Sequence, residues 1–353
     1  MNTALQSYGF VPFFARQTSI DEVAGGRVAR VTEVQRSVIT VADGCEEKHL
    51  PITSSWLGAA PEDQPTVGDW VVLDSQHSRV ERLLDRKSVF RRIAAGEKAE
   101  IQLIAANIDI LFVVTSCNEE FKESRLERYL ALAVEAGVIP VVILTKTDLA
   151  DDPDSYAVRA RNVQSGVHVE QINALDKRTF AGVLAWVEPG STIALVGSSG
   201  VGKSTILNTL AAQDVAATSA IRENDKKGRH TTTHRALHRL PDGGLLIDVP
   251  GMRQLKVADV DAALPKVFDD IEALASECRF ADCQHESEPG CAVRAAIESG
   301  RISGRRLQSY QRLLRENERH NASLAERRAN ERAFARHVRH VLSHKQRRRD
   351  GSD

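Results

Sequence analysis

The segment Gly197-Ser-Ser-Gly-Val-Gly-Lys203-Ser204 limits what this chain can fold into more than any other part of the sequence. It fits the pattern G-x-x-x-x-G-K-[ST], whose glycines let a loop wrap so closely that backbone N–H groups face phosphate oxygens. The apolar run 191–196 before it is typical of a strand, and residues 204–210 after it are typical of a helix. This order predicts a phosphate-binding α/β domain, in which Lys203 reaches the β and γ phosphates and Ser204 ligates magnesium.

The segment Thr145-Lys-Thr-Asp148 comes about fifty residues before that loop and predicts which base the nucleotide carries. The carboxylate of Asp148 can accept two hydrogen bonds from the N1 and N2 donors of guanine, whereas adenine presents no such pair. The apolar run 139–145 predicts a buried strand whose C-terminal end delivers these residues, where ligands gather in open α/β sheets. Guanine is therefore the favoured base, and an ATP-dependent P-loop enzyme would need adenine selectivity despite Lys146 and Asp148.

Two polar segments downstream of the loop supply the remaining phosphate chemistry, Gly228-Arg-His-Thr-Thr-Thr233 and Asp248-Val-Pro-Gly251. We expect Thr232 to complete the magnesium shell, Asp248 to hold the metal through water, and the Gly251 amide to contact the γ phosphate. A methionine follows the second segment, and its apolar side chain cannot orient an attacking water. Another residue must therefore position that water.

A cluster of cysteines and one histidine near residue 280 predicts a metal site. The chain has five cysteines, an odd number, and three of them crowd with a histidine into fourteen residues, which suits a metal better than a disulfide framework. Three soft thiolates and one imidazole favour a tetrahedral structural zinc ion with no open catalytic position. The alternative is a set of reduced thiols without a ligand. The predicted zinc ligands are Cys278, Cys283, His285 and Cys291.

The N-terminal third alternates short β-rich runs with turns, at residues 26–31, 37–41 and 69–73, and helical periodicity is scarce. This pattern predicts a small β-barrel. Its aromatic residues suit either stacking on nucleic-acid bases or packing in the core, and they are Trp56, Trp70 and Phe90.

The net charge of −1 hides an asymmetry along the chain. Residues 301–353 hold fifteen Lys and Arg against six Asp and Glu, a balance of +9. Apolar residues between 307 and 314 have helical spacing, and the basic run 345–349 suits an RNA phosphate backbone, although a solvated helix or a disordered end fits the tail too. No apolar stretch approaches the length that spans a bilayer, so we expect a cytoplasmic protein without a membrane partner.

Together these motifs resemble the circularly permuted GTPases of the ribosome small subunit-dependent GTPase A (RsgA) type. The resemblance rests on the motif order, with Lys-x-Asp before the phosphate loop, and it extends to residues 65–71, 86–92 and 102–109 and to the cysteine cluster. It implies a multidomain α/β protein with an N-terminal OB-fold β-barrel, a circularly permuted P-loop GTPase domain, and a C-terminal zinc-binding domain with a helical tail. The expected units are an N-terminal arm at 1–24, the OB-fold at 25–92, the GTPase domain at 93–257 and the C-terminal domain at 258–353.

The same resemblance implies a GTPase that binds the small (30S) ribosomal subunit and its ribosomal RNA late in maturation. It implies hydrolysis of GTP to GDP and phosphate that the subunit stimulates, with one structural Zn²⁺ and with Mg²⁺ on the nucleotide, and we expect a monomer. His230 is implied as the residue that orients the attacking water, beside Lys203 and Thr232, although a loop histidine that contacts RNA or solvent is the alternative. A rival function is a nucleotide-sensing RNA-binding or scaffold protein without significant turnover, which stimulated hydrolysis would separate.

Three positions depart from common GTPase patterns. Thr145 stands where many GTPases have Asn and supplies a hydroxyl but no amide, and Gly200 argues against the usual potassium site. Asn173-Ala174 stands where Ser-Ala is usual, and Ala174 can still offer its backbone N–H to guanine O6. The magnesium ligands expected are Ser204, Thr232 and Asp248. The expected nucleotide-binding residues are Thr145, Lys146, Asp148, Asn173, Ala174, Gly197, Ser198, Ser199, Gly200, Val201, Gly202, Lys203, Ser204, Thr205, Asp248 and Gly251.

Overall fold

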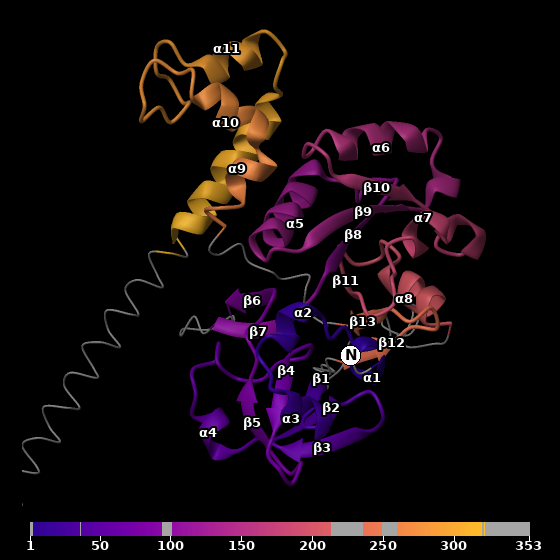
Figure 1. Cartoon of the computed structure of the whole chain (residues 1–353). Helices are drawn as coiled ribbons and strands as arrows, with labels where there is room; N and C mark the ends of the chain where they lie inside the picture. Colours follow the sequence, from indigo (N-terminus) through magenta and orange to yellow (C-terminus); the bar gives the residue numbers. More distant parts are fainter. Residues whose placement is uncertain are drawn as a thin grey trace, which may run out of the picture.

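The structure is a computed structural model that describes residues 3–35, 37–93, 101–212, 236–248, 260–319 and 321. Figure 1 shows a β-rich N-terminal part, a central part in which helices surround a sheet, and a C-terminal helical part that projects beside α5. The chain therefore combines helices with a sheet, as expected for the α/β class.

Within the described ranges, the central part contains five parallel strands in the order β10, β9, β8, β11 and β13. Three of them, β8, β9 and β11, carry nearly continuous apolar residues, as strands covered on both faces do. The strands predicted at 139–145 and 191–196 are confirmed. The bounds are β8 Ile110–Ser116, β9 Ile139–Thr145, β10 His168–Gln171, β11 Thr192–Val196 and β13 Leu245–Asp248.

Helices cover both faces of this sheet. Leu111 of β8 lies in one core cluster with Leu126 of α5, while Phe112 lies in a second cluster with Ile206 of α8. This alternation follows from the two-residue period of a strand. The helix predicted after the phosphate loop is confirmed as α8. The bounds are α5 Glu123–Glu135, η1 Thr147–Leu149, α6 Pro153–Arg161, η2 Lys177–Phe180, α7 Ala181–Leu184 and α8 Lys203–Ala211.

The sheet continues into the N-terminal part through β12 (Ala236–Arg239), which pairs with β13 on one side and with β1 on the other. β1 pairs with β2 and β4, β2 with β3, and β4 with β5, all antiparallel. Among the described residues no pairing joins β3 to β5, so the ring is not closed and an OB-fold barrel is not confirmed. The bounds are α1 Thr3–Gln6, α2 Pro12–Ala15, α3 Ile20–Ala24, β1 Val28–Val34, β2 Val38–Ala42, β3 Glu47–Pro51, α4 Ser54–Leu57, β4 Trp70–Leu73 and β5 Val80–Leu83, with a separate hairpin of β6 Val89–Ile93 and β7 Ile101–Ala106.

The aromatic residues of this part pack inward. Trp70 and Phe90 are 0% and 3% exposed, so the core interpretation holds for both. Trp56 is half-buried, and its indole N–H donates to the carbonyl oxygen of Val80 at 3.4 Å. Neither Trp70 nor Phe90 therefore has an exposed ring face on which a base could stack.

Arg30 ties the N-terminal helices, the β-rich part and the central part together. Its side chain is buried, and the guanidinium donates to the carbonyl oxygens of Tyr8, of Gly68 at 3.2 Å and of Asn107 at 3.0 Å. Burial lowers the pKa of Arg30 to about 10, so the group stays charged at neutral pH. One cation thus satisfies carbonyls from three separate segments.

The C-terminal part docks on α5 through charged groups. Glu127 of α5 has a fully buried side chain that accepts hydrogen bonds from Arg305 and Arg306, each at 3.0 Å. Arg306 also donates to Asp270 of α10 at 2.7 Å. Residues 304–319 form one helix, which confirms the helical spacing seen near residue 310. The other bounds are α9 Leu264–Val267, α10 Asp269–Ala275 and α11 Ala292–Glu298.

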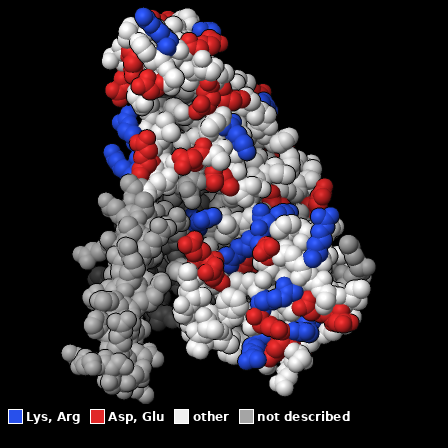
Figure 2. Space-filling view, turned by 60° about the vertical axis from the view of Figure 1, so that its left-hand side comes forward, with Lys and Arg blue, Asp and Glu red and all other residues white. Residues whose placement is uncertain are grey.

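In the part of the chain that the structure describes, no helix has the length and apolar character required to cross a bilayer. Figure 2 shows one face of the molecule, on which acidic and basic side chains are interspersed. That face offers no broad area of a single charge.

Candidate functional site

The loop between β11 and α8 has the backbone shape that a phosphate cradle needs. Gly197 has a φ of 149°, and a side chain there would lie 2.2 Å from a carbonyl oxygen of β8, so only glycine fits. Gly202 has a φ of 97° and directly precedes Lys203, the first residue of α8. The loop therefore ends at a helix N-terminus, whose free N–H groups attract anions. The predicted residues Ser199 and Gly200 lie in this loop, and Ser204 and Thr205 lie in the first turn of α8.

Ser198 anchors two cations in this loop. The ammonium of Lys203 donates to its carbonyl oxygen, and the guanidinium of Arg125 donates to its hydroxyl. Arg125 lies in the first turn of α5 and is held by the carboxylate of Glu120 at 3.0 Å, a bond that lowers the pKa of Glu120. Arg125 was not predicted from the sequence, because its partner in the loop is 73 residues away and no local pattern marks it.

Thr145, at the end of β9, joins the predicted guanine-reading segment to the phosphate loop. The residue is fully buried, and its hydroxyl lies 2.6 Å from the carbonyl oxygen of Val201 and 3.2 Å from that of Thr115. The shorter contact is the stronger hydrogen bond. The hydroxyl that replaces the usual amide therefore forms a link between the two loops.

Lys146 and Asp148 follow directly after this link. Lys146 has a φ of 57°, a left-handed turn that ends β9, and Asp148 lies in the short η1 helix. Asp148 is exposed, so its carboxylate is open to a ligand. The chain thus presents the predicted base-reading carboxylate at the carboxyl edge of the parallel sheet.

Asn173 and Ala174 follow the neighbouring strand β10 and reach the same place. The side-chain oxygen of Asn173 accepts from the backbone N–H of Leu175 at 3.0 Å, which shapes this turn. A side-chain carbon built on Gly202 would lie 3.7 Å from Cβ of Ala174 and 3.6 Å from a methyl of Thr145. The three predicted loops therefore meet in space although they are far apart in the sequence.

Other predicted site residues lie outside the described part of the chain. These are His230, Thr232 and Gly251. Asp248 ends β13, next to β11 in the sheet, and only its backbone is described. The roles of all the predicted nucleotide and magnesium residues remain predictions, although the phosphate loop and both base-reading segments now share one edge of the sheet.

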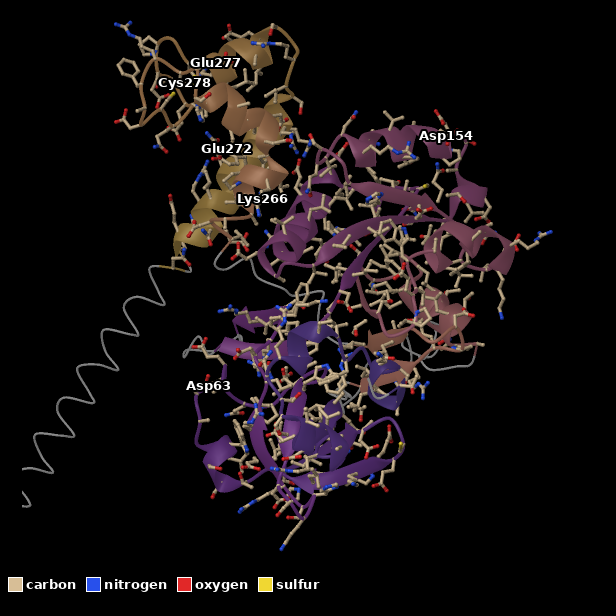
Figure 3. The ribbon with its side chains drawn as sticks, in the orientation of Figure 1. Asp63, Asp154, Lys266, Glu272, Glu277 and Cys278 are labelled. Carbon is tan, nitrogen blue, oxygen red and sulfur yellow. The ribbon has the colours of Figure 1, made fainter. Side chains whose placement is uncertain are left out.

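The four residues of the cysteine and histidine cluster come together at the end of the C-terminal part, where Figure 3 shows Cys278. Their ligand atoms all lie within 4.8 Å of one another. The Sγ of Cys278 is 3.9 Å from Sγ of Cys291 and 3.7 Å from Nδ1 of His285. Tetrahedral zinc, with Zn–S near 2.3 Å and Zn–N near 2.0 Å, would set such atoms about 3.5–3.8 Å apart. The donor set therefore fits a structural metal ion.

The backbone around this cluster is arranged for anionic groups. Cys291 is the N-cap of α11, and its sulfur accepts from the backbone N–H of Arg294 at 3.4 Å. Burial opposes ionisation of Cys278, but nearby backbone N–H groups outweigh burial and lower the pKa of its thiol. At Cys283 burial prevails and raises the pKa of the thiol to about 11. A thiolate is the form that binds metal, so these N–H groups favour the liganded state.

Comparison with known proteins places this arrangement in a family. The sequence profile of the RsgA GTPase family matches residues 83–258. The small ribosomal subunit biogenesis GTPase RsgA 2 of Vibrio parahaemolyticus is 46% identical over 344 residues, which cover 98% of this chain and 94% of that protein. The small ribosomal subunit biogenesis GTPase RsgA of Mesorhizobium japonicum is 48% identical over 258 residues, which cover 72% of this chain and 74% of that protein.

Solved structures show the same fold. The crystal structure of YjeQ from Thermotoga maritima matches with a TM-score of 0.59 at 24% identity, over 82% of this chain and 98% of that one. YloQ, described as a circularly permuted GTPase, matches with a TM-score of 0.57 at 24% identity, over 82% of this chain and 94% of that one. A base-reading strand that precedes the phosphate loop agrees with this permuted order. The extent of the sequence matches, together with the shared fold, shows that the chain belongs to the RsgA family of circularly permuted GTPases.

Proposed function

We propose that this chain binds the small ribosomal subunit late in its maturation and hydrolyses GTP to GDP and phosphate. In this proposal, contact with ribosomal RNA orders the segment 228–233, hydrolysis follows, and the protein dissociates. The names of its relatives, small ribosomal subunit biogenesis GTPases, support the partner. The observation that best supports the nucleotide assignment is the hydrogen bond from the Thr145 hydroxyl to the Val201 carbonyl oxygen, because it links the predicted base-reading segment to the phosphate loop.

Each residue of the site has a role in this proposal. Asp148 accepts the N1 and N2 hydrogen bonds of guanine and the Ala174 N–H donates to O6, while loop residues 197–205 hold the phosphates. Lys203 stabilises the charge that develops on the β and γ phosphates, and His230 orients the attacking water. Bound magnesium would neutralise phosphate charge, and its proposed ligands are Ser204, Thr232 and Asp248.

The remaining parts support binding to the subunit. We propose the four units 1–24, 25–92, 93–257 and 258–353, with the β6–β7 hairpin joining the second to the third. The second unit is proposed to be an OB-fold that contacts ribosomal RNA, since β1 to β5 have the antiparallel order of that barrel. The metal of the cysteine cluster is proposed to be zinc, and the protein a cytoplasmic monomer.

The proposal is tested by measuring GTP and ATP hydrolysis by the purified protein, alone and with isolated small or large ribosomal subunits, at low and moderate salt. We expect slow intrinsic GTP hydrolysis and strong, GTP-specific stimulation by small subunits. Equal rates under every condition would instead favour a nucleotide-sensing RNA-binding or scaffold protein without significant turnover.

The role of His230 is tested separately with His230→Ala. This variant should lose stimulated turnover and keep GTP affinity, because the side chain acts on water and not on the bound nucleotide. Turnover at the wild-type rate with small subunits would remove His230 from the mechanism.

A further inference from the structure

A groove of about 820 Å³ runs between α5 and the helix formed by residues 304–319. Five arginines and one glutamate line it, together with serine and glutamine side chains. The arginines are Arg128, Arg305, Arg312, Arg315 and Arg319. The groove lining therefore carries an excess of positive charge, with five guanidinium groups against one carboxylate.

The helix places three of these arginines on one side because of its period. Positions 312, 315 and 319 follow an i, i+3, i+7 pattern, which lies along one face of an α-helix. Leu307 and Leu313, on the opposite side, are 8% and 2% exposed and pack in the core. At 1.5 Å per residue, Arg312 and Arg319 are about 10 Å apart along the axis. This row is long enough to face several successive phosphates of one nucleic-acid strand.

The charges of the groove are only partly balanced within the protein. Arg128 makes two hydrogen bonds of 2.6 Å to Glu316, and Arg305 bonds to the buried Glu127. Glu316, the acid among the lining residues, is thus already neutralised. Within the described residues, Arg312, Arg315 and Arg319 are exposed and form no salt bridge. Three unbalanced guanidiniums in a row will attract an anionic ligand.

The chemistry of the lining favours phosphates over a protein partner. Protein interfaces depend on apolar and aromatic anchors buried in pockets, and the groove lining has no apolar or aromatic residue to receive them. Guanidinium groups bind phosphate oxygens through paired hydrogen bonds, and Ser and Gln side chains donate to phosphate and sugar oxygens. The occupant that matches is a sugar-phosphate backbone.

We propose that this groove binds the phosphate backbone of an RNA segment, with Arg312, Arg315 and Arg319 as its contacts. The choice of small-subunit RNA as the source rests on the proposed function. The groove thereby adds a second RNA contact to the one proposed for the β-rich part.

The test compares the full-length protein with Arg312→Gln/Arg315→Gln/Arg319→Gln. A charge-matched control carries Arg161→Gln, Lys177→Gln and Lys266→Gln, three exposed basic residues outside the groove and outside the β-rich part, of which Lys266 is labelled in Figure 3. Binding to purified small ribosomal subunits is measured by co-sedimentation from 50 to 200 mM salt. Binding to a fluorescent 20-base-pair RNA duplex, with and without polyglutamate, is measured in parallel, and circular dichroism verifies the fold of each variant.

Each lost phosphate contact lowers the slope of log K against log salt by about 0.7 to 0.9, so the groove variant should lose about 2 to 3 units. The ratio of the variant's affinity to the wild-type affinity should therefore rise about 20- to 40-fold from the lower to the higher salt concentration. The control should keep the wild-type slope. A wild-type slope in the groove variant overturns the proposed groove while leaving the proposed function intact.

Failure of the wild-type protein to bind small subunits would refute the proposed function. Binding of the RNA duplex would then test the proposed groove independently. Weaker duplex binding by the groove variant than by the control supports the groove, and equal binding overturns it. Displacement of the duplex by polyglutamate at equal charge concentration would overturn the RNA assignment in favour of an acidic protein.

Discussion

The link between Thr145 and Val201 leads to the most direct prediction from the site. Thr145→Val keeps the shape of the side chain and removes the hydroxyl that lies 2.6 Å from the Val201 carbonyl oxygen. Both residues are fully buried, so water cannot replace the lost donor. We expect the phosphate loop and the base-reading segment to be held together less firmly in the variant.

The size of the effect follows from leaving a buried carbonyl without its partner. That loss costs about 1–3 kcal/mol, which corresponds to about 5- to 150-fold in an equilibrium constant. If the link holds both loops in their binding geometry, the Kd for GDP should rise at least about fivefold. The Kd for GTP should rise by the same factor, because neither partner of the link is among the residues predicted to contact the γ phosphate, which are Lys203 and Gly251.

The assay is a titration with fluorescent GDP and GTP analogues, together with urea unfolding of the free protein. Thr115→Val is the matched control, since Thr115 is a buried threonine of the adjacent strand β8 whose hydroxyl has only a 3.5 Å contact with Glu120. The control should change Kd less than about twofold. A wild-type Kd in Thr145→Val, or a loss confined to GTP, would refute the proposed link.

Four further predictions follow from the site, the docking interface, the metal centre and one helix cap. Asp148→Asn should relax the preference for GTP over ATP at least about tenfold, or 1.4 kcal/mol, by removing the carboxylate from the guanine donors; unchanged selectivity in competition binding would contradict the base assignment. Glu127→Gln should lower the free energy of unfolding by about 3 kcal/mol, because it leaves the buried Arg306 and the exposed Arg305 without their shared, buried anion, whereas Asp176→Asn, in an exposed pair, should cost less than about 1 kcal/mol in the same urea titration. Zinc chelation should increase hydrogen exchange in residues 278–298 and spare the central sheet, and full protection after metal removal would argue against a metal centre. A backbone hydrogen bond from the N-cap serine lowers the pKa of Glu22 below 4.5, so its contribution to stability should be present above pH 4.5 and fade as pH falls through the lowered pKa; Glu22→Gln should lack this pH dependence in unfolding experiments.

The parts of the fold that could be predicted from the sequence are those whose cause is local. The strand that ends at Thr145 and the helix that starts at Lys203 are confirmed, because apolar runs and glycine positions act over a few residues. The cluster of Cys278, Cys283, His285 and Cys291 also follows from close spacing, since fourteen residues must fold back on one another to share a ligand. The prediction of an OB-fold rested on the family resemblance. Closure of that barrel depends on a pairing between β3 and β5, distant in the sequence, which the described residues do not show.

The sequence by itself therefore predicts the nucleotide-binding chemistry, through the glycines of the phosphate loop and the carboxylate of Asp148. Tertiary structure alone decided which distant residues support that chemistry. Thr145 meets a carbonyl 56 residues away, Arg125 meets Ser198 across 73 residues, and Arg306 meets Glu127 across 179. The reason is physical: the chain has 47 Lys and Arg and 48 Asp and Glu that are chemically alike in sequence, and only strand order and helix docking select which of them become neighbours.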